Sequence, residues 1–206
     1  MDVRRTLLVS ICLLLPSVAT AERPHPVVVC YGDSITAGYG LSSDQAYPAA
    51  LQRDLIRLGF HDRVVNLGAS GATTKDAVDG LHSVLALHPA VVIVEFGGND
   101  GLRGLPLNQT QKNLEIVLDS LASAHIRVLL AGITLPPNYG ADYIAQFNKV
   151  YRDLALHHRV AFVPMIYKDV IRQSGTIQDD GIHPTAKGSE ILARTLLRAL
   201  KPLLSD

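Results

Sequence analysis

The sequence contains little cysteine, no excess of charge of either sign and no long hydrophobic run. Two cysteines, Cys12 and Cys30, are too few for a disulfide framework. Lys and Arg together number 19, and so do Asp and Glu, so the net charge does not favour binding to nucleic acid. No linker rich in Pro, Ser or Gly divides the chain, and no internal repeat is present. These absences predict a single domain over residues 22–206.

The first 21 residues have the pattern of a secretory signal peptide. Arg4 and Arg5 precede an apolar run at residues 7–15, and small residues suited to cleavage follow at 19–21. A run of about 9 residues is too short to cross a bilayer, which takes about 20. We expect cleavage after residue 21, no stable membrane insertion, and a periplasmic or secreted protein. Loss of the signal removes two basic residues and one acidic residue, which leaves 17 basic and 18 acidic residues.

Short runs rich in β-branched residues alternate with longer segments of helical period. Strands are predicted at residues 27–31, 63–66, 90–96, 127–131 and 160–163. Helices are predicted at residues 45–58, 74–87, 107–124, 141–157 and 185–200. This alternation predicts an α/β fold, in which helices cover both faces of a central parallel sheet of about five strands. Ligands of such sheets bind beyond the carboxyl ends of the strands.

Four short motifs contain the groups that an acyl-transfer site needs. Ser34 follows the first predicted strand and is a candidate nucleophile, and His183 near the end of the chain is a candidate base. Asp180, three residues before this histidine, is suited to orient it. Gly71 follows the second strand and Asn99 the third, where a backbone N–H and a side-chain amide can stabilise an oxyanion. Three of the four motifs therefore lie at the edge of the sheet where ligands bind.

The loop around Ser34 is open to two other interpretations. Ser34 could be a turn residue that satisfies local backbone donors. A strand followed by Gly32, Ser34 and Gly38 also describes loops that cradle the phosphate of a flavin or nucleotide. Asp33 disfavours that second interpretation, because a carboxylate in the cradle would repel a phosphate.

The turn that contains Gly71 also holds a rival nucleophile, Ser70. Gly68-x-Ser70 begins the G-x-S-x-G pattern of another hydrolase fold, although Ala72 occupies its closing position. If Ser34 is the nucleophile, this turn contributes only the backbone N–H of Gly71, as an oxyanion donor.

Asp180 and His183 can face each other across a turn that precedes the last predicted helix. Pro184 keeps His183 out of the helical region and is favoured where a helix begins. Asp180 can then accept the Nδ1 proton, which leaves Nε2 free to take a proton from Ser34. The alternative is a helix-start aspartate beside a surface histidine. No histidines show the spacing of a metal site such as H-E-x-x-H, so we expect no metal.

Taken together, the four motifs resemble those of the GDSL, or SGNH, hydrolase superfamily. Residues 97–104, 135–140 and 178–184 resemble its exported acyl-thioesterase, lysophospholipase and arylesterase branch. The resemblance implies a flavodoxin-like three-layer α/β/α fold and no cofactor. Ile35 replaces the leucine of the family's name, and Ala72 stands where related members often carry an acidic residue. The second departure bears on specificity more than on activity.

The resemblance also implies roles for the motif residues: Ser34 as nucleophile and backbone oxyanion donor, Gly71 and Asn99 as the other donors, His183 as base and Asp180 as its partner. It implies esters or thioesters of medium or long acyl chains as substrates. Apolar residues beside the motifs are candidates for the acyl groove: Leu102, Leu105, Pro106, Leu135, Pro136, Tyr139 and Ile182. The alternatives are a carbohydrate O-deacetylase on the same fold and a flavin- or nucleotide-binding module without turnover. The sequence leaves the oligomeric state open.

Overall fold

The five predicted strands pair into one parallel sheet in the computed structural model, which describes residues 25–204. The strands are β1 (Val27–Gly32), β2 (Arg63–Gly68), β3 (Val91–Glu95), β4 (Arg127–Ala131) and β5 (Ala161–Val163). Their spatial order is β2-β1-β3-β4-β5, the flavodoxin-like order. The inner strand β3 is buried along its whole length, as a strand covered on both faces should be, whereas the edge strand β2 is partly exposed.

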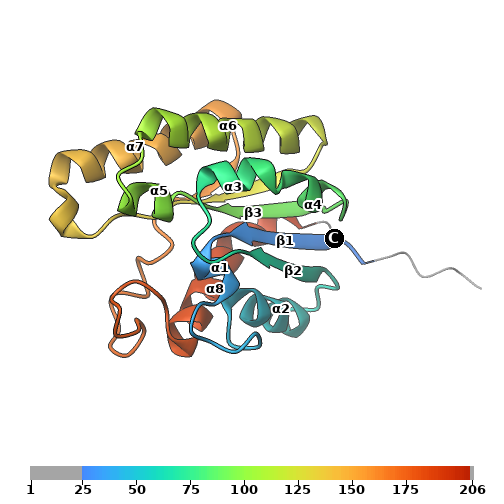
Figure 1. Cartoon of the computed structure of the whole chain (residues 1–206). Helices are drawn as coiled ribbons and strands as arrows, with labels where there is room; N and C mark the ends of the chain where they lie inside the picture. The colour runs from blue at the N-terminus through green and yellow to red at the C-terminus, as the bar shows by residue number, and fades with distance from the viewer. Residues whose placement is uncertain (1–24, 205–206) are drawn as a thin grey trace, which may run out of the picture.

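Helices cover both faces of this sheet (Figure 1). The α-helices are α1 (Ser34–Ala37), α2 (Tyr47–Arg57), α3 (Thr74–Asp79), α4 (Leu81–Leu85), α5 (Gly98–Leu102), α6 (Leu107–Ser123), α7 (Ala141–His158) and α8 (Ala186–Leu200). Two 3-10 helices are η1 (Pro137–Tyr139) and η2 (Lys201–Leu203). Helices α3, α6 and α7 lie on one face, and α2 and α8 pack together on the other. The predicted three-layer α/β/α fold is therefore confirmed.

The structure differs from the sequence prediction mainly in short helices near the strand ends. Helix α1 begins at Ser34 because the Asp33 side chain accepts a hydrogen bond from the backbone N–H of Ile35, and it ends at Gly38, whose φ is 82°. The predicted helix at 74–87 is divided at Gly80 into α3 and α4. Helices α1 and α5 lie outside the predicted helices. A capping side chain and glycines thus give short helical turns that periodicity does not reveal.

The strand register places three site loops at one level of the sheet. Gly32 at the end of β1 pairs with Gly68 of β2 and with Glu95 of β3. The chain crosses over one face after β1 and over the other after β3, so the switch point of the topology lies between these two strands. The motifs that follow β1, β2 and β3 therefore begin side by side.

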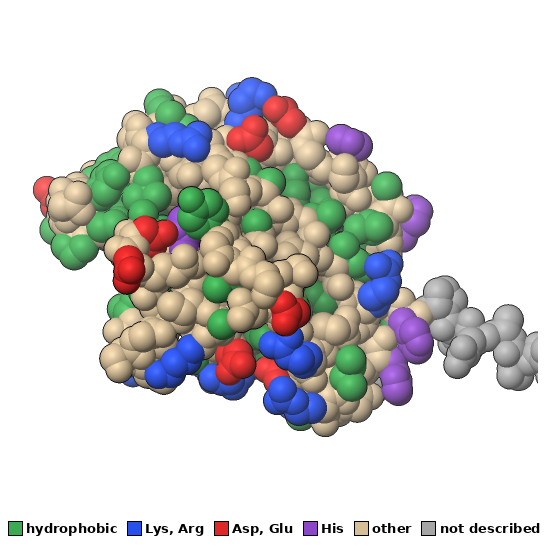
Figure 2. Space-filling view, turned by 60° about the horizontal axis from the view of Figure 1, so that its bottom comes forward, with side chains coloured by type: hydrophobic (Ala, Val, Ile, Leu, Met, Phe, Trp, Pro, Cys, Tyr) green, Lys and Arg blue, Asp and Glu red, His purple; other side chains and the backbone are tan. Residues whose placement is uncertain are grey.

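The predicted signal peptide, residues 1–21, lies outside the described residues. Within residues 25–204, no helix combines the length and the apolar character that crossing a membrane requires. On the face shown in Figure 2, Lys and Arg side chains are interspersed with Asp and Glu and do not gather into a patch of one sign.

Candidate active site

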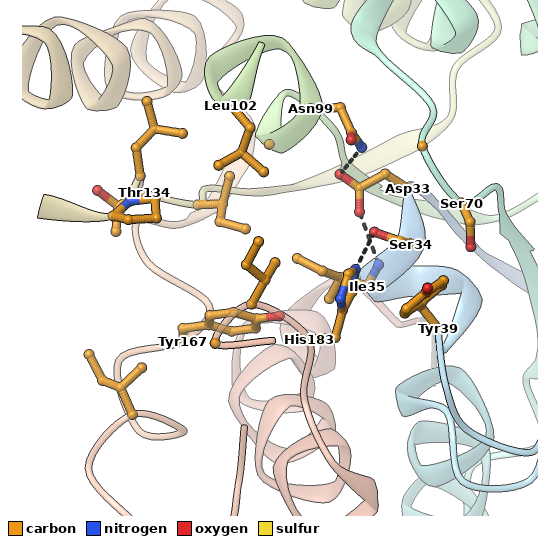
Figure 3. A pocket seen from close by; sticks show the side chains of 18 of the residues that line it. Asp33, Ser34, Ile35, Tyr39, Ser70, Asn99, Leu102, Thr134, Tyr167 and His183 are labelled. Carbon is orange, nitrogen blue, oxygen red and sulfur yellow. Dashed lines mark hydrogen bonds between the residues drawn. The ribbon is translucent and has the colours of Figure 1, made fainter. Parts of the chain in front are cut away.

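Ser34, His183 and Asp180 form a continuous chain of hydrogen bonds, part of which is drawn in Figure 3. His183 Nε2 lies 2.8 Å from Ser34 Oγ, and His183 Nδ1 lies 2.6 Å from Asp180 Oδ2. Ser34 is presented at the start of α1, directly beyond β1, whereas Asp180 and His183 come from the loop before α8. The arrangement has the geometry of a nucleophile, a base and an orienting carboxylate.

The Asp180 carboxylate is held in its charged form by the loop that it belongs to. Partial burial acts to raise its pKa, but hydrogen bonds from the His183 side chain and from the backbone N–H groups of His183 and Ile182 outweigh this effect. They lower the pKa of Asp180 to about 2. Asp180 is therefore ionised at neutral pH and can accept the Nδ1 proton of the imidazole.

Gln178 ties the histidine loop to the segment that follows α1. Its Nε2 donates to Tyr39 O at 2.8 Å and to Pro184 O at 2.9 Å, and its backbone N–H donates to His183 O at 2.8 Å. The Tyr39 ring also lies against the imidazole, with ring centroids 4.5 Å apart. Thr185 caps α8, so Pro184 lies one residue outside the helix and not at its first position. His183 is held outside the helix, as its position before a proline predicts.

The two expected oxyanion donors both line the same cavity as Ser34. Asn99 Nδ2 donates to Ala72 O at 3.0 Å and makes a longer contact of 3.3 Å with Asp33 Oδ2. Gly71 has a φ of 80°, a conformation that favours glycine, and its carbonyl accepts a hydrogen bond from Arg103 Nη2 at 2.9 Å. The amide of Asn99 and the peptide of Gly71 are thus each fixed by neighbouring groups beside Ser34.

Two buried carboxyl groups lie beneath the nucleophile. Asp33 and Glu95 are 2% and 0% exposed, and their side chains are within hydrogen-bonding reach of each other. Burial raises the pKa of Asp33 to about 6, against the lowering effect of its hydrogen bonds. Burial, followed by the charge of Asp33, raises the pKa of Glu95 well above its ordinary value. Both shifts favour a proton within the pair, and the larger shift favours Glu95 as the group that carries it.

An apolar cavity of about 570 Å³ opens beside Ser34. Four of the residues expected to form an acyl groove line it: Leu102, Leu135, Pro136 and Ile182. Among the described lining residues, the other three expected ones do not occur. Tyr139 instead donates its hydroxyl to Leu102 O at 2.8 Å, and Pro106 caps α6 after the partly exposed Leu105. Of these three residues, Tyr139 supports the groove from outside through this bond to Leu102.

Several lining residues were missed from the sequence. Tyr39 and Ile133 follow α1 and β4, and Met165, Tyr167 and Ile171 lie between β5 and α8. The segment after β5 has no clear periodicity, but it begins directly after a strand, at the edge where ligands bind. Its position directly after β5 was therefore the only feature of the sequence that could have indicated these lining residues. Glu95 was missed too, although a single acidic residue in an apolar strand needs a buried partner.

The rival nucleophiles lack a base in the described part of the chain. Ser70 lines the cavity, but no imidazole is hydrogen-bonded to it among residues 25–204. Cys30 is fully buried, and burial raises the pKa of its thiol to about 12, so it stays protonated and inert.

Two neighbouring histidines lie close together outside the cavity. Consecutive side chains usually diverge on a helix, but the ring centroids of His157 and His158 in α7 are 4.9 Å apart. With Glu115 they form a group whose potential ligand atoms lie within 4.8 Å of one another. None of the three lines the cavity.

Comparisons with known proteins agree with this geometry. Residues 30–191 match the model of the GDSL-like Lipase/Acylhydrolase family. Esterase TesA of Pseudomonas aeruginosa is 40% identical over 201 residues, which cover 97% of this chain and 100% of that protein. Thioesterase 1/protease 1/lysophospholipase L1 of Escherichia coli is 37% identical over 84% of this chain and 83% of its own length.

Solved structures show the same fold. A crystal structure of TesA superposes with a TM-score of 0.83 at 41% identity, over 86% of this chain and 99% of that one. The psychrotrophic esterase EstA from Pseudoalteromonas sp., in a structure inhibited by monoethylphosphonate, gives a TM-score of 0.81 at 26% identity. The match covers 87% of this chain and 99% of that one. This chain belongs to the GDSL-like lipase/acylhydrolase family.

Proposed function

We propose that this protein is a serine hydrolase that cleaves carboxylic esters and thioesters of medium to long acyl chains. One observation carries the proposal: the His183 Nε2 to Ser34 Oγ contact of 2.8 Å at the wall of an apolar cavity. The Asp180 carboxylate behind the imidazole and the fixed amide of Asn99 supply the remaining parts. The names of the relatives, which include an esterase and a thioesterase, support the same reaction class.

The reaction proceeds through an acyl-enzyme. Ser34 Oγ attacks the carbonyl carbon while its proton passes to His183 Nε2, and Asp180 stabilises the imidazolium that forms. The backbone N–H groups of Ser34 and Gly71 and the amide of Asn99 stabilise the oxyanion. The tetrahedral intermediate then expels the alcohol or thiol, which takes the proton from the imidazolium. Water attacks the acyl-enzyme in the same way, with the imidazole as base, and releases the acid.

The lining of the cavity favours a long acyl group over an acetyl group. Leu135 and Ile133 are nearly fully buried beside the site, and Met165 and Ile182 extend the same apolar wall. Burial of each further CH₂ group is worth about 0.8 kcal/mol, or about a fourfold gain in affinity for the transition state. This argument disfavours a carbohydrate O-deacetylase, because the acetyl group of its substrate is too short to cover the apolar wall of the cavity.

We also propose that the protein is exported after removal of residues 1–21. Coenzyme A esters are cytoplasmic, so membrane-derived lysophospholipids and small exogenous esters fit an exported enzyme better. The apolar cavity suits the acyl chain of either class.

The test is a comparison of kcat/KM for p-nitrophenyl acetate, octanoate and palmitate and for a lysophospholipid, with the wild type and Ser34→Ala side by side. We expect kcat/KM to rise from acetate to octanoate and the activity to vanish in the variant. A preference for acetate would indicate a deacetylase. Equal turnover by both proteins would reject Ser34 as the nucleophile.

A further inference from the structure

The proposed mechanism assigns no role to Glu95, although this residue lies at the junction of the two strands that carry the site. Glu95 ends β3, three residues before the start of α5, which holds Asn99, and it pairs with the end of β1, shortly before Ser34. Its backbone carbonyl accepts a hydrogen bond from Asp33 N at 3.2 Å. An acidic residue at 0% exposure requires partners that offset the loss of hydration.

The contacts of Glu95 leave one of its oxygens without a donor. Oε2 accepts a hydrogen bond from Thr36 Oγ1 at 2.8 Å. Oε1 is fully buried and has no N–H or O–H donor among residues 25–204, yet the Asp33 carboxyl group is within hydrogen-bonding reach of the Glu95 side chain. Two buried carboxyl groups that lie side by side raise each other's pKa, so the protonated form of one of them is favoured. A proton on one carboxyl group supplies the O–H donor that the pair needs.

Asp33 connects this pair to the loop of the nucleophile Ser34 and to the oxyanion donor Asn99. Its Oδ1 accepts the backbone N–H of Ile35 at 3.0 Å, which fixes the first turn of α1 directly after Ser34. Its Oδ2 receives the 3.3 Å contact from Asn99 Nδ2, as Figure 3 shows. One carboxyl group thus touches the nucleophile's loop and the oxyanion donor together.

Gly32 provides the space that this arrangement needs. A Cβ at that position would lie 2.1 Å from Thr36 Oγ1 and 2.7 Å from Glu95 Oε2. Only glycine allows Thr36 and Glu95 to meet beneath the loop.

We propose that Glu95 is a positioning residue, which stays protonated, donates a hydrogen bond to the Asp33 carboxylate and thereby holds Ser34 in register with Asn99. The inference rests on the proposed hydrolase function, because it concerns the alignment of that reaction's groups. Glu95 is not among the described residues that line the cavity. Its loss should therefore lower kcat and leave KM nearly unchanged.

The test compares Glu95→Leu with Glu95→Gln, using Val92→Ala as the control. Leucine removes the donor, and misplacement of reacting groups by about 1 Å can cost about 10²-fold, so we expect kcat to fall by about 10- to 100-fold with KM within about twofold. Glutamine keeps a neutral donor and should retain kcat within about threefold. Val92, also buried in β3, is remote from the cavity, so its truncation should lower the melting temperature without changing kcat.

A second measurement does not depend on the folding of Glu95→Leu. The infrared spectrum of the wild-type protein at neutral pH should contain the carbonyl stretch of a buried carboxylic acid, and Glu95→Gln should lack it. Absence of that band in the wild type, or loss of activity in the glutamine variant equal to that in the leucine variant, would overturn the proposal. If Ser34→Ala is inactive while Glu95→Leu keeps full kcat, only the positioning role fails and the hydrolase function stands.

Discussion

Truncation of Asn99 to alanine tests how the site stabilises an oxyanion. Asn99 Nδ2 has two hydrogens, of which one is engaged by Ala72 O at 3.0 Å and the other makes only the longer contact of 3.3 Å with Asp33 Oδ2. The second hydrogen is therefore the one that can turn to a substrate oxygen in the cavity. Loss of one oxyanion donor typically costs about 2.7 to 4 kcal/mol in the transition state.

The contact between Asn99 and Asp33 reduces the loss of transition-state stabilisation expected for Asn99→Ala. When the amide binds the oxyanion it gives up that hydrogen bond, worth about 1 kcal/mol, so the net loss in Asn99→Ala is about 2 to 3 kcal/mol. At about 1.4 kcal/mol per tenfold, kcat should fall by about 30- to 150-fold. The alanine variant should still bind substrate, because the apolar wall is unchanged.

The assay is steady-state hydrolysis of p-nitrophenyl octanoate, with kcat and KM determined separately. Asn113→Ala is a matched control, because Asn113 is a buried amide that donates to Thr74 Oγ1 at 3.0 Å and does not line the cavity. We expect its kcat within about twofold of the wild type. If kcat of Asn99→Ala decreases by less than about fivefold, or if kcat of the control decreases equally, the assignment of Asn99 as an oxyanion donor is refuted.

Three further predictions concern the carboxyl groups. Asp180→Asn should lower kcat by about 10² to 10⁴, because the amide cannot accept the Nδ1 proton as a carboxylate does; a loss below about tenfold in steady-state kinetics would contradict its role. Asp100→Ala should lower the free energy of unfolding by about 3 to 5 kcal/mol in urea titrations, because the buried N–H and the hydroxyl hydrogen of Thr74 both lose their acceptor; a change below about 1 kcal/mol would show that the network is dispensable. The raised pKa of Glu95 means that the folded chain keeps a proton that the unfolded chain releases above its ordinary pKa of about 4.3, so this group reduces stability as pH rises. Glu95→Gln should therefore gain stability relative to the wild type as the pH rises above about 4.3, and a difference that does not vary with pH would contradict the raised pKa.

The strands and long helices follow from local sequence patterns. The run at 127–131 has β-branched and aliphatic residues, and β4 occupies those residues. The segment at 107–124 has helical period, and α6 covers all but its last residue. The spacing of Asp180 and His183 before a proline also agrees with the geometry, because a contact over three residues depends mainly on the local backbone.

The cavity and the buried carboxyl pair depend on long-range packing that no local pattern contains. The segment after β5 reaches the cavity because Ile166 N donates to Gly132 O at 3.0 Å, a contact between residues 34 positions apart. Asp33 and Glu95 meet only because β1 and β3 are neighbours in the sheet. The resemblance implied the flavodoxin-like three-layer fold, but sequence reasoning could not place individual side chains of these loops in space.

The most direct test of the account is to find where an organophosphonate attaches. The wild type, Ser34→Ala and Ser70→Ala are each treated with a p-nitrophenyl phosphonate ester, and the modified peptide is identified by mass spectrometry. We predict one label per chain on Ser34 in the wild type and in Ser70→Ala, and none in Ser34→Ala. A label on Ser70, or equal labelling of Ser34→Ala and the wild type, would contradict the central claim that Ser34 is the nucleophile.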